Sequence, residues 1–285
     1  MAHKIDVKLK HTYLALVLLD LVGSTAFVQK VGPIKAARWL QFHDRLARSV
    51  CYKNNGREID RSDGFLMSFD SMADAVKFAL EYNKRVMPKT GLKARIGIHW
   101  GDIVEVHQDE LFVGVGAKKV ELEGISKNIA ARTMSLADPS QILLTKDAFK
   151  RLIATPALRL PKELRSACVG LYKFKGVSEP QEIYSVAEDV DLLQPPKGNE
   201  KAKRLGGPKY IKKRLRDRKL KDWFKSFYKT AAPFAVSFYV YAIYKISLSH
   251  TLQQLFGLEF LSALSPYSEE IQAVINSLLE TIGQL

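Results

Sequence analysis

The sequence predicts an α+β domain in which an antiparallel sheet carries helices on one face. Two observations predict this class. Apolar runs and amphipathic segments follow one another in the order strand, helix, strand, strand, helix, strand. The two middle strands flank a tight turn, which indicates a hairpin and therefore antiparallel pairing. A chain of 285 residues with 47% hydrophobic content is long enough for one such domain and an additional segment.

The first half of the chain contains the clearest element signals. Residues 11–20 are almost entirely apolar, which is typical of a buried strand. Pro33 begins a helix that extends to about Lys53, because its apolar residues recur three and four positions apart. The hairpin strands are residues 57–61 and 65–69. This part of the sequence therefore predicts strand, helix and hairpin in that order.

The remaining elements follow from caps and apolar runs. Ser71, with Asp74 three residues later, caps a helix that extends to about Met87. The other expected elements are a strand at 92–100, a strand at 103–106 that pairs with it, a helix at 124–136, a strand at 141–145, and closing strands at 172–176 and 182–186. This order is that of a ferredoxin-like core.

The expected domain organisation has three parts. Residues 1–188 form the globular domain, residues 189–208 form a linker rich in Pro, Gly and Lys, and residues 209–285 form a basic and then apolar helical tail. Between Lys197 and Lys229 there are 14 Lys and Arg and three acids, so this window holds +11 of the net charge of +14. The concentration of charge in one segment argues against a nucleic-acid-binding fold spread along the chain.

The tail allows more than one interpretation. Residues 209–229 interleave basic and aromatic side chains, a pattern that suits RNA or the surface of an anionic membrane. The apolar run at 231–248 contains Lys245 and is marginal for spanning a bilayer, so we favour a soluble or peripheral tail. Residues 1–10 lack the apolar run of a signal peptide. We therefore expect a cytoplasmic protein, with residues 209–264 as the segment that would contact a membrane.

Three short polar segments carry the chemistry. Asp20 ends the first apolar strand and is followed by the small residues Gly23, Ser24 and Thr25. Carboxylates at strand ends suit divalent cations, and a turn of small residues lets backbone N–H groups approach phosphates. The other two segments are the turn Ser-Asp-Gly-Phe at 62–65 and the helical Asn-Ile-Ala-Ala-Arg at 128–132. Together they indicate metal-assisted chemistry on a triphosphate.

Five motifs in order resemble those of class III nucleotide cyclases, the adenylate and guanylate cyclase catalytic domains. They are Asp-Leu-Val-Gly-Ser-Thr at 20–25, Ser-Asp-Gly-Phe at 62–65, Arg-Ile-Gly-Ile-His-Trp-Gly at 95–101, Asn-Ile-Ala-Ala-Arg at 128–132 and Lys-Gly-Val-Ser-Glu-Pro at 175–180. Each motif alone is weakly specific, whereas five in order and at suitable spacing are strongly specific. The resemblance covers about residues 12–187.

The resemblance implies a site with two divalent cations, Mn²⁺ or Mg²⁺. Asp20 and Asp63 would be the shared carboxylate ligands, and the backbone carbonyl of Leu21 would be a further ligand. The resemblance also implies that Asn128 positions the ribose and that Arg132 stabilises charge on the transferring phosphoryl group.

The resemblance further implies phosphate contacts and a dimer. Gly23, Ser24 and Thr25 would bind the β- and γ-phosphates, and either Lys173 or Lys175 would reach the triphosphate. In this family the site lies between two subunits. The resemblance implies that Asp20 and Asp63 come from one chain and Asn128 and Arg132 from the other, and therefore a homodimer with two symmetric sites.

The residues expected around the base depart from the family pattern. Adenylate cyclases of this class usually have a lysine at the position of Ile59 and an aspartate or threonine at the position of Glu121, while guanylate cyclases usually have a glutamate at the position of Ile59. Strand alternation places Arg57, Ile59 and Arg61 on the same face as Asp63. Arg61 as donor and Glu121 as acceptor would suit uracil, although cytosine and guanine also satisfy such a pair. The alternative is a structural ion pair between Arg61 and Glu121.

These departures, in a short chain, resemble the pyrimidine cyclases of bacterial Pycsar anti-phage systems. That resemblance implies conversion of UTP to cyclic UMP, a second messenger for a separate effector protein. Two alternatives stay open: an adenylate cyclase with an altered base pocket, and a catalytically degenerate domain that binds a nucleotide as a regulatory module. The presence of both aspartates and of Arg132 argues against degeneration.

Overall fold

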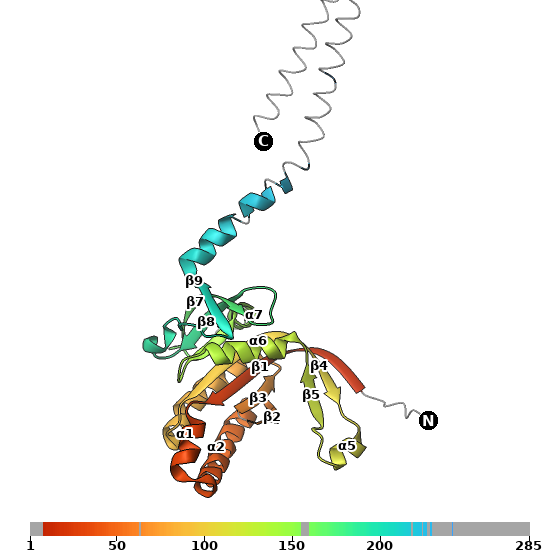
Figure 1. Cartoon of the computed structure of the whole chain (residues 1–285), viewed down its shortest axis with the longest axis vertical. Coiled ribbons are helices and arrows are strands. Elements are labelled where there is room, and N and C mark those ends of the chain that lie inside the picture. Colours follow the sequence, from red (N-terminus) through yellow and green to blue (C-terminus); the bar gives the residue numbers. More distant parts are fainter. Residues whose placement is uncertain are drawn as a thin grey trace, which may run out of the picture. The chain divides into compact units, whose positions relative to one another are not determined.

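The computed structural model describes residues 8–62, 64–154, 160–217, 219–223, 225–226, 229 and 241 (Figure 1). Residues Met1–Arg214 form one compact unit and residues Leu215–Leu285 a second. Within the described residues, the first unit contains a nine-stranded sheet in the order β2-β3-β1-β4-β6-β8-β7-β9, with β5 paired to β4. The predicted α+β class is therefore confirmed.

Strand β1 (Lys8–Leu21) lies at the centre of the part of the sheet that concerns the site. It pairs antiparallel with β3 (Gly64–Phe69) on one side and with β4 (Ala94–His107) on the other. Ala15, Val17 and Leu19 are buried in the core on one face of the sheet, and Leu14 and Leu16 in a second cluster. Burial on both faces explains why the apolar run of this strand is nearly continuous.

Helices cover both faces of the sheet, so the expectation of helices on one face was wrong. Helices α2 (Pro33–Lys53), α3 (Met72–Glu81) and α7 (Lys146–Ile153) contribute to the core with Val17 and Leu19. Helix α6 (Ile125–Leu136) contributes Ala130 to the cluster with Leu14 and Leu16, on the other face. Its backbone lies directly against β4, because a Cβ atom at Gly97 would be 2.1 Å from the backbone nitrogen of Met134. We call these the α2 face and the α6 face.

Strand β4 also differs from the prediction. Residues 92–100 and 103–106 were expected to be two strands that pair with each other, but they belong to one strand that pairs with β1 along its whole length. The partner of its second half is β5 (Val120–Glu123), after the short helix α5 (Glu110–Gly114). Strand β6 (Ile142–Thr145) pairs parallel with β4, so the sheet is not entirely antiparallel.

The hairpin and the helix caps agree with the sequence. Strand β2 (Arg57–Arg61) pairs antiparallel with β3, with a bulge between Glu58 and Asp60. The Ser71 hydroxyl accepts a hydrogen bond from the backbone N–H of Asp74, as the capping signal predicted. The predicted helix to Met87 is formed by α3, a π-helical turn η1 (Tyr82–Val86) and α4 (Met87–Thr90).

The segment expected to be a linker is part of the folded domain. Strands β7 (Arg165–Phe174) and β8 (Gln181–Ala187) are followed by the 3₁₀ helix η3 (Val190–Leu193) and by β9 (Ala202–Gly206), which pairs with β7. The Tyr172 hydroxyl donates to the Pro196 carbonyl at 2.8 Å. Strand β9 exposes its charged residues, as edge strands commonly do, so its composition resembled that of a linker.

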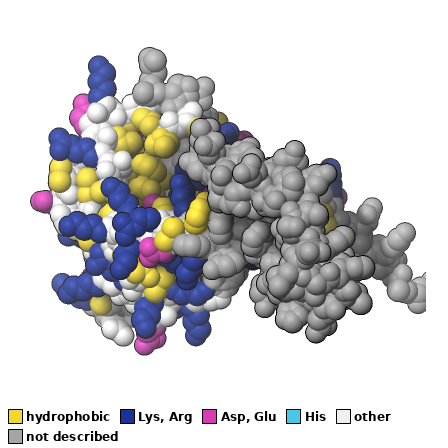
Figure 2. Space-filling model, turned by 90° about the horizontal axis from the view of Figure 1, so that it is seen from above, with side chains coloured by type: hydrophobic (Ala, Val, Ile, Leu, Met, Phe, Trp, Pro, Cys, Tyr) yellow, Lys and Arg dark blue, Asp and Glu magenta, His cyan; other side chains and the backbone are white. Residues whose placement is uncertain are grey.

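The described part of the tail is helical at residues 208–217 and 219–223. Leu215, Leu220 and Trp223 are exposed there. The apolar run at 231–248 lies almost entirely outside the described residues, as does most of the segment that we expected to contact a membrane. In the part of the chain that the structure describes, no helix is both long and apolar enough to cross a bilayer. On the face drawn in Figure 2, many Lys and Arg side chains surround hydrophobic patches.

Candidate active site

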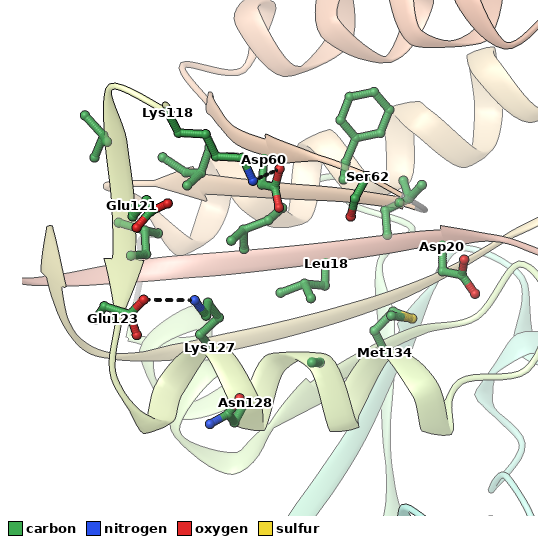
Figure 3. A pocket seen from close by; sticks show the side chains of 18 residues that line it. Leu18, Asp20, Asp60, Ser62, Lys118, Glu121, Glu123, Lys127, Asn128 and Met134 are labelled. Carbon is green, nitrogen blue, oxygen red and sulfur yellow. Dashed lines mark hydrogen bonds and ion pairs between the residues drawn. The ribbon is translucent and has the colours of Figure 1, made fainter. Parts of the chain in front are cut away.

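A cavity of about 430 Å³ opens on the α6 face, between the β2–β3 hairpin, strands β1 and β5 and helix α6 (Figure 3). Its apolar walls include Leu18, Ile59, Leu66, Leu122 and Met134. Its polar residues include Asp20, Asp60, Lys118, Glu121, Glu123, Lys127 and Asn128. A concave site with apolar walls and a few convergent polar groups is typical of small-molecule binding.

Asp20 is at the end of β1, as the sequence predicted. Its side chain is 22% exposed and forms an ion pair with Arg95, which lies directly opposite on β4. The Nε atom of Arg95 is buried and has no hydrogen-bond partner in the described structure. Arg95 was not predicted to contribute to the site, although it is the first residue of the motif at 95–101. It reaches Asp20 through the register between β1 and β4, which the sequence alone does not reveal.

The second predicted metal ligand, Asp63, lies outside the described residues. Gly64, the next residue, pairs with Asp20 across the β1–β3 ladder. A Cβ atom at Gly64 would be only 2.0 Å from the Leu19 carbonyl oxygen, so the backbone of β3 can approach β1 this closely only with glycine. The motif Ser-Asp-Gly is therefore more than a turn signal, because its glycine sets where β3 begins beside Asp20.

The small-residue turn after Asp20 begins helix α1 (Ser24–Val31). Gly23 has a left-handed backbone conformation (φ 75°), and no side chain caps the helix there. Ser24 and Thr25 are its first two residues. Leu21 itself is buried. Uncapped N–H groups at the start of a helix favour an anion. Phosphate binding by Gly23, Ser24 and Thr25 stays a prediction.

Asn128 and Arg132 lie one turn apart on α6, and the structure places them in different surroundings. Asn128 is exposed and lines the cavity. Arg132 is half-buried and donates from Nε to the Lys175 carbonyl at 3.4 Å. Lys175 itself belongs to the turn between β7 and β8, which lines a separate depression with Lys173. In a single chain, the predicted set is therefore divided: Asp20, Ile59, Glu121 and Asn128 line the cavity, whereas Arg132 and Lys175 lie beside each other outside its lining.

The expectation that Arg57, Ile59 and Arg61 share one face was wrong. The bulge between Glu58 and Asp60 breaks the alternation of β2, so Ile59 and Asp60 both line the cavity. Arg61 is turned to the α2 face. Arg61 does not line the cavity that contains Glu121, so the two residues predicted to contact the base are not brought together. Their alternative ion pair is not formed in the described structure either, because Arg61 pairs with Asp44 and Glu121 with Gln108.

On the α2 face, Arg61 belongs to a partly buried polar cluster. Its Nε donates to Asp44 at 2.9 Å, and its guanidinium lies 5.0 Å from the centre of the Phe65 ring. Burial alone would raise the pKa of Asp44, but hydrogen bonds from His43 and Arg61 lower it on balance. His43 also contacts the Tyr82 hydroxyl at 2.6 Å.

Arg57 remains on the α6 face but does not line the cavity. It forms an ion pair with Glu105 of β4. Burial would raise the pKa of Glu105, but the hydrogen bond and charge of Arg57, together with the charges of Lys10 and His107, outweigh burial and lower it. Arg57 is thus held by a carboxylate outside the site.

Four charged residues of the cavity were not predicted from the sequence: Asp60, Lys118, Glu123 and Lys127. Lys118 forms an ion pair with Asp60, and the two side chains are 51% and 31% exposed. Glu121, which was predicted, accepts a hydrogen bond from the Gln108 side chain at 3.3 Å. The bulge that brings Asp60 here and the pairing of β5 with β4 that brings Lys118 here are properties of the folded sheet, so no local signal marked either residue.

The donor set around Asp20 fits a hard divalent cation, since carboxylate and carbonyl oxygens are the ligands that Mg²⁺ and Mn²⁺ prefer. Among the described residues there is no group of three or more His, Cys, Asp and Glu side chains that could hold a metal ion by itself. Asp20 therefore needs further ligands to hold a cation. These would be Asp63, which lies outside the described residues, and oxygen atoms of a bound small molecule.

The fold and the cavity define an α+β domain whose cavity on the α6 face is suited to a small ligand. The model of the family "Adenylate and Guanylate cyclase catalytic domain" matches residues 7–188, and the chain therefore belongs to this family.

Curated relatives match over a limited region. The chain is 32% identical over 96 residues to the receptor-type adenylate cyclase GRESAG 4.1 of Trypanosoma brucei brucei, which covers 34% of this chain and 7% of that relative. It is 26% identical over 163 residues to an adenylate cyclase of Mycosarcoma maydis, covering 48% of this chain and 6% of the relative. The chain thus spans a small part of the length of these relatives.

Solved structures share the fold at low sequence identity. The adenylyl cyclase CyaB from P. aeruginosa matches with a TM-score of 0.56 at 17% identity, covering 64% of this chain and 97% of that one. The guanylate cyclase domain of RhGC from Catenaria anguillulae, crystallised with GTP, matches with a TM-score of 0.53 at 16% identity, covering 62% and 98%. These similarities establish the cyclase fold.

Proposed function

We propose that this chain is a metal-dependent nucleotide cyclase that converts a nucleoside triphosphate to a 3′,5′-cyclic nucleotide and diphosphate. The observation that carries the proposal is the cavity on the α6 face, with Asp20 at one end and Glu121 and Lys118 at the other (Figure 3), in a chain of the cyclase family. Such a cavity has apolar walls for a base and polar groups for the edge of the base, and Asp20 at its border is a carboxylate suited to the cations of a triphosphate.

The residues of the chain would divide the work as follows. Two divalent cations, Mg²⁺ or Mn²⁺, would lower the pKa of the ribose 3′-hydroxyl and offset phosphate charge when bound. Asp20, Asp63 and the Leu21 carbonyl would hold them. The N–H groups at Gly23, Ser24 and Thr25 would bind the β- and γ-phosphates.

Two residues of α6 would act on the reacting atoms. Asn128 would orient the ribose so that its 3′-oxygen is in line with the α-phosphorus. Arg132 would stabilise the charge on the transferring phosphoryl group, a contribution worth ~10²–10³ in rate for one well-placed donor. Lys175, whose carbonyl accepts from Arg132, would bring a further positive charge to the triphosphate.

We further propose that the active form is a homodimer. Arg132 and Lys175 lie outside the lining of the cavity that contains Asp20 in the same chain. A second chain related by twofold symmetry would bring its own Asn128, Arg132 and Lys175 to Asp20 and Asp63 of the first, and the same arrangement would form twice.

For the base we propose UTP, with cyclic UMP as the product. Arg61 lies on the α2 face, outside the cavity, but Lys118 is a hydrogen-bond donor in the same cavity as Glu121. The cavity therefore has both a donor and an acceptor, as uracil requires. ATP is the alternative, since the curated relatives are adenylate cyclases. A role in anti-phage signalling through a separate effector protein is part of this proposal and is supported by the sequence resemblance alone.

A competition assay tests the proposal. Purified protein is incubated with Mn²⁺ and equal concentrations of ATP, GTP, CTP and UTP, and cyclic products are resolved by mass spectrometry. We expect cyclic UMP to dominate. Cyclic AMP as the main product would contradict the choice of base and keep the cyclase, whereas triphosphate binding without any cyclic product would favour a regulatory module.

A further inference from the structure

The end of the cavity that is farthest from Asp20 contains a group of charged side chains that the family motifs do not include. Lys118 and Asp60 form an ion pair there, and Glu121 lies beside them (Figure 3). Asp60 belongs to β2, Lys118 comes just before β5 and Glu121 belongs to β5, and only the folded sheet brings the three together.

Two structural features place this pair over the cavity. The bulge between Glu58 and Asp60 puts two successive residues, Ile59 and Asp60, on the cavity wall. Strand β5 pairs with the end of β4, which brings Lys118 to the same wall, although it is 58 residues from Asp60 in the sequence. Ile59 therefore brings no polar atom to the cavity, but the charged residues Asp60 and Lys118 line the same cavity.

We propose that Lys118, held over the cavity by Asp60, donates a hydrogen bond to the base of the nucleotide and so determines base specificity. The proposal rests on the proposed function, because it takes the end of the cavity with Asn128 and Glu121 as the place of the ribose and the base. The base then lies between the apolar side chains of Leu18, Ile59 and Leu66.

The chemistry of Lys118 and Glu121 suits the edge of a base. The Lys118 ammonium only donates and the Glu121 carboxylate only accepts, so together they match an edge that has a carbonyl next to a ring N–H. UTP and CTP differ at this edge: position 4 of uracil is a carbonyl and N3 carries a proton, whereas cytosine has an amino group and an unprotonated N3. A lysine that faces position 4 favours UTP, and a carboxylate in its place favours CTP.

Lys118 can also exchange its ion-pair partner, Asp60, for a ligand. Lys118 is 51% exposed and Asp60 is 31% exposed, and an ion pair at this exposure is weak, so the ammonium can turn to a ligand at little cost. Asp60 is a positioning residue in this scheme, since it keeps the long Lys118 side chain over the cavity.

The experiment measures kcat/KM for UTP and for CTP with the full-length protein and its variants. Lys118→Met removes the donor and Lys118→Glu reverses its polarity; the matched control is Lys119→Met, at the exposed neighbouring residue. We expect Lys118→Met to lower the UTP to CTP ratio roughly tenfold or more, as the loss of a charged hydrogen bond does. Lys118→Glu should shift the ratio further toward CTP, and Lys119→Met should leave it unchanged.

Asp60→Asn distinguishes positioning from a purely structural role. It should lower the ratio less than Lys118→Met and act mainly through KM for UTP, with kcat and the melting temperature close to those of the wild type. An unchanged ratio in Lys118→Met would overturn the inference and leave the proposed function standing.

Failure of the proposed function gives a different result. If the wild type forms no cyclic product, calorimetric affinities for UTP and CTP of the same variants replace kcat/KM, and an unchanged affinity ratio in Lys118→Met again overturns the inference. If the wild type binds no triphosphate, the proposed function and the inference both fail. If it prefers ATP or GTP, only the choice of UTP is wrong, and the ratio between the two best substrates decides the role of Lys118.

Discussion

The two faces of strand β1 have different surroundings. On the α2 face, Val17 and Leu19 are completely or almost completely buried with Phe78 and Tyr82 in a continuous core. On the α6 face, Leu18 and Asp20 border a cavity of about 430 Å³. One side of the strand therefore supplies stability through packing, and the other leaves room for a ligand.

Charged groups on the two faces differ in the same way. On the α2 face, Asp44 and Arg61 are 14% and 19% exposed, and Asp44 also bonds to the fully buried His43. On the α6 face, Asp60 and Lys118 form a pair that is far more accessible to solvent. A buried, mutually satisfied cluster is costly to disturb, whereas a half-exposed pair can exchange its partner for a ligand. We therefore expect changes on the α2 face to alter stability and changes in the cavity to alter activity.

The largest expected effect is on activity at Asp20. Asp20→Asn keeps the size of the side chain but removes the charge that the proposed cations require. We expect kcat to fall by roughly 10³-fold, since the stabilisation that a bound cation supplies is several kcal/mol. The melting temperature should change little, because the side chain is partly exposed.

The control for this variant is Asp70→Asn. Asp70 is an exposed carboxylate just beyond the other end of β3, and we expect its variant to be as active as the wild type. Asp20→Asn with wild-type kcat in a Mn²⁺-dependent assay would remove the residue from the site. A large loss of melting temperature would instead assign Asp20 a structural role through Arg95.

The next largest effect concerns pH and His99, which lies in β4 on the α6 face. Burial lowers the pKa of His99 from 6.5 to about 4, although Asp147 and Asp102 oppose the shift. The unfolded chain therefore binds a proton at a higher pH than the folded protein. The stability due to the neutral imidazole is complete above pH 6.5 and is lost as the pH falls toward 4, by roughly 3 kcal/mol in the free energy of unfolding.

Urea denaturation between pH 7 and pH 4.5 measures this loss. His99→Gln, which cannot titrate in this range, should be less stable than the wild type at pH 7 and should show a flatter dependence on pH. His11→Gln, at a histidine with a 62% exposed side chain, is the control and should follow the wild type. Equal slopes for all three proteins would show that His99 is not the source of acid sensitivity.

Much of the fold was predictable because local signals agreed with tertiary packing. The helix at Pro33–Lys53 and the strand at Arg57–Arg61 occur with the expected bounds. The second covered face was missed although the run of apolar residues in β1 indicated it. Strand β9 was missed because an edge strand with exposed basic residues has the composition of a linker.

The site was predictable only where its residues belong to motifs. Asp20 and Asn128 line the cavity as residues of such motifs. Arg61 was misplaced because a single bulge reverses the faces of all residues beyond it, and periodicity alone does not reveal a bulge. Lys118 was missed because its place depends on pairing between distant strands, which no local pattern encodes.

A smaller effect tests whether Arg61 belongs to the α2 face. Arg61→Leu leaves the partly buried Asp44 without one of its two hydrogen-bond partners. We expect the free energy of unfolding to fall by about 1–3 kcal/mol, as for an unpaired buried polar group, with no change in the UTP to CTP ratio. A changed ratio without a loss of stability would restore the sequence-based prediction that Arg61 contacts the base.

The smallest effect is expected at the surface of the α2 face. Arg48 donates two hydrogen bonds to Glu58 at 2.6 and 2.8 Å, and the two side chains are 50% and 28% exposed. Arg48→Ala should lower the free energy of unfolding by at most about 1 kcal/mol, less at high salt, because exposed ion pairs are screened. Urea denaturation at low and high salt measures this. Because Glu58 immediately precedes Ile59 and Asp60, a change in base selectivity would mean that the bulge transmits strain between the faces, and the separation of stability from function would then fail at β2.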